Sequence, residues 1–361
     1  MAKIGVVTFS NTIDNYGQVL QYLAIQEYLK TRGHEVSLLR IDNHIGFIRR
    51  VVRKIKQLRN KKSVKKVKTT YDLWSESSER NEKLHPRFFE DFRQRYFNIS
   101  YLKLPKYKNV FDALVVGSDQ IWSGLSSWGY LNFARYGEVK FTIAPSIGKF
   151  VPDENRITTL KSWLADYSFI TCREQSAVDM CKKAGREDAQ LVLDPTFLIS
   201  PGIYLKYASK SKPGKEYIFL YLLGADIQPN VSDIYKFAEE EGLEVKYVAS
   251  QGREDEYPKE WATISEWLTL LSNAKYVFTN SFHGMALSCI FQKQFLVFPI
   301  VGEMQGMNER IFNIAHAFHC EDRIYRGDIE SVKNNVETDI IKKQIASNRM
   351  KMCELLNSIN Y

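Results

Sequence analysis

The stretch from Lys275 to Pro299 constrains the fold of this chain more than any other, because it reads as a complete strand, turn, helix and strand. Tyr276 to Thr279 is a short run of aromatic and β-branched residues, which is typical of a strand buried on both faces. Asn280 and Ser281 follow it and can accept hydrogen bonds from the free amides of a helix that begins there. Phe295 to Phe298 is the next strand. The stretch therefore predicts half of a nucleotide-binding type of α/β domain.

His283 and Gly284 lie in the turn of this unit. In such units ligands bind outside the carboxyl ends of the strands, where helix amides and the helix dipole favour anions. His283 can donate to a bound phosphate or carboxylate, and Gly284 can let the backbone approach the ligand. The alternative is a purely structural histidine. Because the helix dipole opposes a charged imidazole at this end of the helix, we expect an anion to bind beside His283.

Strand-like and helix-like runs alternate through both halves of the chain. At 361 residues, 44% of them hydrophobic, the chain is long enough for two proper cores. We predict an α/β fold with two Rossmann-like domains facing across a cleft. The predicted parts are an N-terminal domain at 1–199 with a basic helical insertion at 45–97, a C-terminal domain at 200–330 that starts with a linker, and a helix at 331–361 able to cross back to the first domain.

Polar residues also follow the predicted strands of the first half. Asp119 comes after the run from Phe111 to Val116 and can take a proton from a sugar hydroxyl, while Trp122 can stack on a sugar ring. Alternatively, Asp119 caps a turn and Trp122 belongs to the core. The candidates for binding a sugar acceptor are Asn15, Gln18, Ser118, Gln120 and Trp122. Asn15 has the alternative role of capping the first helix.

Arg173 follows another predicted strand and is placed for a bidentate grip on a carboxylate or phosphate. Its alternative role is a surface ion pair with Glu174 or Asp179. His316, His319 and Cys320 form an HxxHC cluster, but their helix presents a buried apolar face and no second ligand cluster completes a site. We therefore expect neither a metal nor a cofactor.

The segment from Arg49 to Lys68 contains eleven Lys or Arg and no acidic residue, which accounts for the net charge of +8. Its apolar residues recur at roughly helical spacing, so it suits an amphipathic helix on an anionic membrane surface. The alternatives are a solvated helix and a nucleic-acid contact. We do not expect nucleic acid, because aromatic residues and recognised binding motifs are lacking there.

The start of the chain enters a strand-like run without a signal peptide, and no apolar run reaches transmembrane length. We expect a cytoplasmic protein that can lie on the inner face of the membrane. The five cysteines are odd in number, scattered and without a CxxC pair, so they read as reduced thiols.

Seven strings, in order and over nearly the whole chain, resemble the polysaccharide pyruvyl transferase family. They are NYGQVLQ, VVGSDQIW, TIAPSIG, REQSAVD, VLDPT, NSFHGMALSCIF and GMNER. The resemblance implies a two-domain fold of the GT-B kind. It also implies transfer of pyruvate from phosphoenolpyruvate to a hexose of a cell-surface polysaccharide precursor, usually as a cyclic ketal and often on a polyprenyl-diphosphate carrier.

In this resemblance, the donor-site histidine of the family matches His283, and an arginine that contacts phosphoenolpyruvate matches Arg173. Ser281 stands where some members carry an arginine, so a cation of the donor site is missing. Arg310 is our candidate for its replacement, because it opens the following predicted helix at the same edge. The expected donor-binding residues are Arg173, Asn280, Ser281, Phe282, Gly284 and Arg310.

We expect His283 to act as an acid or to stabilise phosphate, and Asp119 to orient a hydroxyl or act as a base, with the two labels exchangeable. The acceptor would then be held by the first half. Two alternatives remain at this stage. One is a nucleotide-sugar glycosyltransferase of the same architecture, and the other is a non-catalytic glycan-binding or membrane-docking protein.

Overall fold

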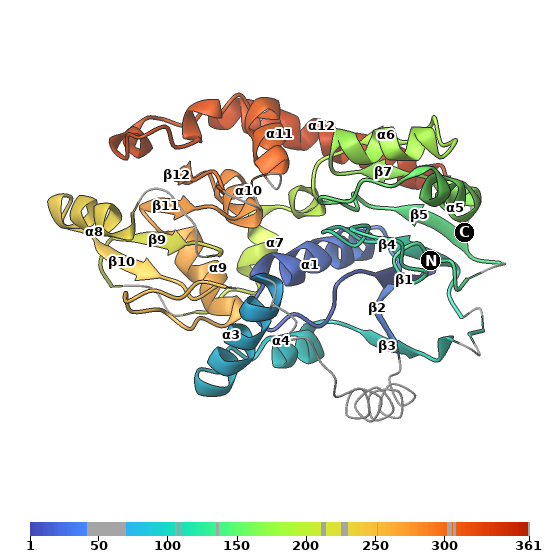
Figure 1. The fold of residues 1–361 in the computed structure, drawn as a ribbon, viewed down its shortest axis with the longest axis horizontal. Helices are drawn as coiled ribbons and strands as arrows, with labels where there is room; N and C mark the ends of the chain where they lie inside the picture. The colour runs from blue at the N-terminus through green and yellow to red at the C-terminus, as the bar shows by residue number, and fades with distance from the viewer. Residues whose placement is uncertain are drawn as a thin grey trace, which may run out of the picture.

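The computed structural model describes residues 1–41, 70–104, 107–108, 110–134, 137–210, 214–224, 230–250, 252–301, 305 and 308–359. Within these residues the chain forms two parallel sheets flanked by helices (Figure 1). The α/β class and the two-domain arrangement predicted from the sequence are confirmed.

The first sheet has six strands in the order β3-β2-β1-β4-β5-β6. These are β1 (Lys3–Val7), β2 (Glu35–Ile41), β3 (Ile99–Leu102), β4 (Ala113–Val116), β5 (Val139–Thr142) and β6 (Tyr167–Phe169). All neighbouring pairs are parallel, with Val7 opposite Val116 in the central pair. Because the strand order reverses between β1 and β4, the loops that leave these two strands flank the position where such sheets bind ligands.

The helices of this half include α1 (Tyr16–Thr31), α3 (Thr70–Leu84), α4 (Phe89–Tyr96), α5 (Glu154–Leu164) and α6 (Gln175–Lys183). Asn15 caps α1, since its side chain accepts a hydrogen bond from the amide of Gln18. Nearly all of α1 is buried, because it lies in the middle of the molecule between the two sheets (Figure 1). A small parallel ladder, β7 (Thr171–Cys172) with β8 (Gln190–Leu191), completes the half.

The second sheet has four parallel strands in the order β10-β9-β11-β12. They are β9 (Tyr217–Tyr221), β10 (Glu244–Tyr247), β11 (Tyr276–Thr279) and β12 (Gln294–Val297), with helices α8 (Val231–Glu240), α9 (Ile264–Asn273), α10 (Phe282–Ile290) and α11 (Glu309–Ala317). A capping box starts α9, in which Thr263 and Glu266 satisfy each other's backbone amides. The reversal of strand order here lies between β9 and β11.

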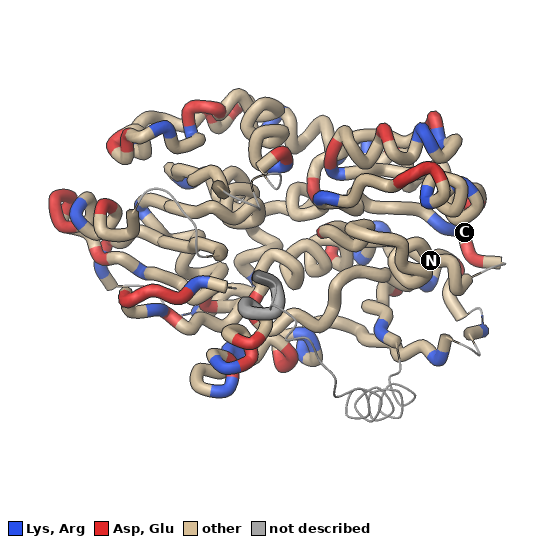
Figure 2. Tube along the Cα trace, in the orientation of Figure 1, with Lys and Arg blue, Asp and Glu red and all other residues tan. Residues whose placement is uncertain are grey.

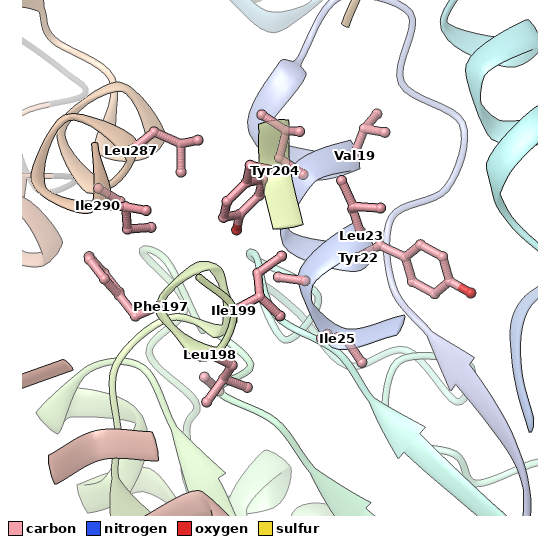
Figure 3. Packing of buried hydrophobic residues seen from close by; sticks show 14 of the residues in the cluster. Val19, Tyr22, Leu23, Ile25, Phe197, Leu198, Ile199, Tyr204, Leu287 and Ile290 are labelled. Carbon is pink, nitrogen blue, oxygen red and sulfur yellow. The ribbon is translucent and has the colours of Figure 1, made fainter. Parts of the chain in front are cut away.

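The two halves share one apolar core. It brings α1 together with η2 (Pro195–Leu198), α7 (Pro201–Leu205) and α10, and Figure 3 shows Leu23, Phe197, Tyr204 and Leu287 from these four elements around a common centre. Each large apolar side chain buried in this way contributes about 1.5–3 kcal/mol. The stretch expected to be a linker after residue 200 therefore includes a packed helix.

Tyr16 extends this connection. Its ring stacks on Trp267 at 5.4 Å, and its hydroxyl donates to the carbonyl of Ala262 at 2.6 Å. The first turn of α1 is thus anchored in the second half of the molecule.

The C-terminal part contains η4 (Glu321–Arg323), η5 (Glu330–Lys333) and the long helix α12 (Thr338–Asn357). The guanidinium of Arg349 on α12 donates to the carbonyls of Phe197 and Ile199, at 2.8 and 2.6 Å. Asn348 accepts from the amide of Leu193 at 2.8 Å. This helix therefore lies against the end of the first half.

Charged residues of both signs alternate along the outer helices, whereas the strands of both sheets are largely uncharged (Figure 2). None of the helices in the described ranges has the length and hydropathy needed to span a membrane. The basic segment 49–68 lies outside the described residues, so its interpretation rests on sequence alone.

Candidate active site

Five charged or titratable side chains meet where the two halves adjoin, and we call them the cleft cluster. They are Asp119, Arg173 and Asp194 from the first half, and His283 and Arg310 from the second. All five side chains are buried.

Asp119 follows β4 at the reversal point of the first sheet. Its backbone has a φ of 64°, in the left-handed region that Asp and Asn tolerate better than most residues. Its carbonyl accepts from the amides of Ile121 and Ser146, both at 2.8 Å, which fixes the loop. The carboxylate then lies 3.6 Å from Nη2 of Arg173 and 4.0 Å from Nη1 of Arg310. One carboxylate thus faces two guanidinium groups.

Arg173 leaves the end of β7 and turns inward. Its Nη1 donates to Oδ2 of Asp194 at 2.8 Å, and its Nε lies 3.8 Å from Oε2 of Glu174. Nε and Nη2 are buried without a hydrogen-bond partner. The surface pairing with Asp179 considered from the sequence does not occur, because Asp179 bonds to Gln175 instead. Unpaired donors on a buried guanidinium are costly, about 1–3 kcal/mol for each group.

Asp194 is the residue of this cluster that the sequence reasoning missed. Its Oδ1 accepts from the amide and hydroxyl of Thr196, at 2.9 and 2.8 Å. Its Oδ2 accepts from Arg173 and from the hydroxyl of Ser118 at 2.9 Å, and lies 3.9 Å from Nε2 of His283. The available signal was the sequence DPT at the end of a predicted strand, since an Asp before Pro there caps the turn that follows.

His283 stands in the first turn of α10, which Ser281 caps by accepting from the amide of Gly284 at 3.3 Å. Its ring fits against α1 because residue 17 is a glycine. A Cβ atom there would lie 2.0 Å from the imidazole Nδ1. On its other side the ring presents Nε2 to the cluster, buried and without a hydrogen-bond partner.

Arg310 opens α11 and shares an aromatic platform with Arg173. The Cζ atoms of Arg173 and Arg310 lie 4.8 and 5.4 Å from the centre of the Phe282 ring. A cation over an aromatic face gains about 0.5–2 kcal/mol. Arg310 makes no hydrogen bond with any residue that the structure describes, and its nearest carboxylate is the one of Asp119. Its charge is therefore weakly compensated.

The electrostatics follow from this arrangement. Burial lowers the pKa of His283, and the nearby acids do not restore it, so the imidazole is neutral near pH 7. Burial would raise the pKa of Asp194, but Arg173 and the His283 ring hold it below its ordinary value. Burial, and next the charge of Arg173, lower the pKa of Arg310 to about 10. Arg310 thus stays charged at neutral pH, at an electrostatic cost.

The cluster opens into a pocket of about 220 Å³ between the halves. Its inner end is formed by Arg173, Asp194, Phe282 and Arg310. The inner end of the pocket is surrounded by two guanidinium groups and a helix N-terminus. Such groups suit a small anion with more than one acidic group.

Four residues expected to bind substrate make structural contacts in this protein, and a binding role for them stays a prediction. Trp122 is fully buried, stacks on Tyr130 at 4.8 Å and donates to the carbonyl of Gly129, so it is core. Ser118 is equally buried and supports Asp194.

The other two are Asn280 and Gly284. The carboxamide of Asn280 bonds to both the amide and the carbonyl of Leu223, at 2.6 and 2.8 Å, and so joins β11 to the end of β9. Gly284 allows close packing on Thr279, whose hydroxyl oxygen would be 2.5 Å from a Cβ atom at residue 284.

The structure shows where the remaining predicted residues lie, but their contacts do not assign them a role. Asn15 and Gln18 lie half-buried in the first turn of α1, and Gln120 lies half-buried beside Gly148. An acceptor role for these three stays a prediction. His316 contacts Glu321 at 3.1 Å, and across the described ranges no three His, Cys, Asp or Glu residues are grouped so that they could hold a metal ion.

The fold and the cleft cluster define a two-domain α/β protein with a buried charged cluster and a pocket between its halves. The model of the polysaccharide pyruvyl transferase family matches residues 15–300. The chain belongs to this family. No curated protein gave a significant match.

Several solved structures align with this chain over nearly its whole length at low identity. A UDP-GlcNAc 2-epimerase from Methanocaldococcus jannaschii is 12% identical with a TM-score of 0.48, over 99% of this chain and 100% of that one. The Neisseria meningitidis UDP-GlcNAc 2-epimerase bound to UDP-GlcNAc is 10% identical with a TM-score of 0.45, over 99% and 100%. An Anabaena protein in complex with UDP and glucose is 9% identical with a TM-score of 0.45, over 99% and 100%.

Proposed function

We propose that this protein transfers pyruvate from phosphoenolpyruvate to a hexose of a cell-surface polysaccharide precursor and forms a cyclic ketal with release of phosphate. The family supports a pyruvyl transferase. The choice of phosphoenolpyruvate as donor is supported by the unpaired hydrogen-bond donors of the cleft cluster.

The observation that carries the proposal is a set of donors without a partner in the cleft cluster, which opens into the pocket. Nε and Nη2 of Arg173 and Nε2 of His283 are buried and unpaired, and Arg310 is a buried cation without a hydrogen bond among the described residues. A small ligand with a carboxylate and a phosphate would satisfy such groups, because charge-assisted hydrogen bonds are about twice as strong as neutral ones. Phosphoenolpyruvate has both groups.

The reaction needs two sugar hydroxyls and two proton movements. The oxygen of the first hydroxyl adds to the central carbon of the donor and gives up its proton, while the methylene carbon takes one proton and becomes methyl. The bond to phosphate then breaks, the second hydroxyl adds to the same carbon, and its proton leaves with the phosphate. We assign His283 to proton transfer or phosphate stabilisation, and Asp119 to orienting or deprotonating the hydroxyl.

Incubation with phosphoenolpyruvate and a panel of lipid-linked and simple galactosides, glucosides and mannosides tests this proposal. We expect phosphate release that depends on one of these sugars, and a product mass that fits addition of one pyruvyl ketal. His283→Ala should abolish turnover while the protein stays folded. Turnover of a UDP-sugar without use of phosphoenolpyruvate would instead identify a glycosyltransferase.

We also propose, from sequence alone, that segment 49–68 holds the protein near a membrane-bound acceptor. Basic residues near an anionic surface are each worth about 1 kcal/mol. Replacing Lys61, Lys62, Lys65 and Lys66 by Gln should then reduce sedimentation with anionic liposomes. Unchanged sedimentation would contradict a role of this segment in membrane binding.

A further inference from the structure

The pocket at the cleft cluster continues outward between β8, α11 and α12. Its outer walls are formed by one face of each helix, with residues spaced by three or four positions. The outer wall residues are Asn313, Ile314 and Ala317 on α11, Gln344, Ser347, Asn348 and Lys351 on α12, and Leu191, Val192 and Leu193 at β8. The pocket therefore has a charged inner end and a second, different end.

The outer end is polar but carries no carboxylate in its wall. Asn313, Gln344 and Ser347 make no hydrogen bond with other described residues, and Gln344 and Ser347 are exposed. Asn348 accepts from Leu193 through Oδ1, but its Nδ2 is buried without a partner. Polar groups thus face this space with unused hydrogen-bonding capacity.

The type of these groups indicates the ligand. Carboxamides and hydroxyls both donate and accept, as sugar hydroxyls do, so the two sets can pair without any charge. The apolar side chains of Leu193, Ile314 and Ala317 offer a surface for the C–H face of a sugar ring. Lys351 is already engaged, since its Nζ donates to the carbonyl of Leu191 at 2.8 Å. A neutral polyol matches this wall better than a second anion does.

Continuity with the inner end gives a second reason. Transfer requires the attacking oxygen to come within about 3–3.5 Å of the donor carbon, so the acceptor must enter the same space as the donor. Arg173, Phe282 and Arg310 line the same pocket as the polar faces of α11 and α12. By contrast, Ser118 and Trp122 are closed off inside the first half.

We propose that this outer pocket binds the acceptor hexose, through hydroxyl contacts with Asn313, Gln344 and Ser347. The inference rests on the proposed function, because the bound sugar is an acceptor only if the protein transfers pyruvate. It moves the acceptor site from the loops of the first half to the two C-terminal helices. All three contact residues lie beyond residue 300, where the family match ends, whereas Arg173, Asp194 and His283 lie inside the match.

The test uses the whole protein and the methyl glycosides of galactose, glucose and mannose as probes. Gln344→Ala combined with Ser347→Ala removes two exposed contacts, and Ser347→Trp fills the pocket. Lys343→Ala is the matched control, because Lys343 is exposed on the same helix but does not line the pocket. Saturation-transfer NMR reports glycoside binding, and calorimetry reports phosphoenolpyruvate binding.

We expect at least one glycoside to bind the native protein, and the double variant to weaken its Kd by about 5–100-fold, since each lost hydrogen bond costs about 2–10-fold. Ser347→Trp should abolish glycoside binding. Lys343→Ala should leave it unchanged, and none of the three changes should shift the Kd for phosphoenolpyruvate more than about twofold.

Two results would overturn the inference. One is that no glycoside binds the native protein, and the other is that binding persists unchanged in both pocket variants. A failure of the proposed function looks different, because the glycoside would bind in the outer pocket while phosphoenolpyruvate neither binds nor releases phosphate.

Discussion

Gly17 and His283 come from opposite halves of the molecule and lie so close that a Cβ atom on Gly17 would be 2.0 Å from the imidazole Nδ1. No real Cβ contact is that short, so the position of the ring depends on the absence of a side chain on α1. The first turn of α1 therefore sets where the imidazole meets the cleft cluster, and it does so across the boundary between the halves.

We predict that Gly17→Ala displaces His283 and lowers turnover by at least about tenfold, since a small shift of a catalytic group is costly. Alanine is the better helix former, so the local effect on α1 should be stabilising by about 1 kcal/mol. A net loss of stability of about 1–3 kcal/mol in urea unfolding would thus report overpacking against the ring. Gly202→Ala is the control, because the nearest atom to its added Cβ would be 3.9 Å away.

A double-mutant cycle separates this contact from other causes. In a His283→Ala background the space beside Gly17 is empty, so Gly17→Ala should cease to destabilise the protein. If the loss of stability is the same in both backgrounds, the clash does not involve the imidazole.

Asp194→Asn should strongly destabilise the protein, because it leaves the buried guanidinium of Arg173 without its closest counter-charge. Removing one partner of a buried ion pair costs about 3–5 kcal/mol. Asp188→Asn is the control. It breaks an ion pair with Arg186 at 2.6 Å, in which the side chain of Asp188 is half exposed. Its loss should lower the free energy of unfolding by at most about 1 kcal/mol. Similar losses for the two variants would contradict a special role for Asp194.

The pH dependence of this effect has a definite sign. The pKa of Asp194 is lowered in the folded protein, so its charge stabilises the fold above the ordinary pKa of 3.8, and this stabilisation is lost as the pH falls through the lowered value. The stability difference between the native protein and Asp194→Asn should therefore be largest near neutral pH and shrink in acid. Unfolding curves measured at pH 7 and at several pH values below 3.8 check this.

Binding of phosphoenolpyruvate should be coupled to protonation of His283. Burial lowers the pKa of His283 in the free protein, whereas a bound dianion would favour the charged imidazole and raise it. Between these two pKa values, binding takes up a proton at His283, and affinity should increase as the pH falls, by up to about tenfold per pH unit.

Calorimetry in two buffers of different ionisation enthalpy measures that proton. Because the phosphate of the ligand also titrates, the comparison that matters is between the native protein and His283→Gln. The native protein should take up more protons than the variant. Equal uptake in both would mean that the imidazole does not respond to the donor.

Local patterns predicted much of the fold and part of the site. The elements between Tyr276 and Phe298 could be predicted because each depends on residues nearby in the sequence. Ser281 caps a helix as expected. Arg310 was found in the same way, from its place at the start of a helix.

Contacts between distant residues could not be predicted in this way. Asp194 meets Arg173 and Ser118 through the folding of the first half, and it meets His283 only because the two halves pack together. Asn280 could have capped a helix by sequence, but it bonds to Leu223, 57 residues earlier. Trp122 follows a polar turn at a sheet edge, and whether such a ring faces a ligand or the core depends on how the next loop folds over it.

Arg310 provides a last prediction, in which stability and function change in opposite directions. Its pKa is lowered to about 10, so the folded environment disfavours its charge, and below pH 10 that charge costs stability. An apolar side chain of similar length removes this cost, and the carboxylate of Asp119 keeps Arg173 as its counter-charge. Arg310→Met should therefore unfold at higher urea concentration, yet bind phosphoenolpyruvate at least about tenfold more weakly.

Arg349→Met is the matched control for this change. The guanidinium of Arg349 is satisfied by the carbonyls of Phe197 and Ile199, so its removal should destabilise the protein and leave the Kd for phosphoenolpyruvate unchanged. If Arg310→Met destabilises the protein to a similar extent, Arg310 is part of the structural framework. If Arg310→Met gains stability and loses donor binding, Arg310 serves to bind an anion. The cost of burying its charge is then offset only when that anion is bound.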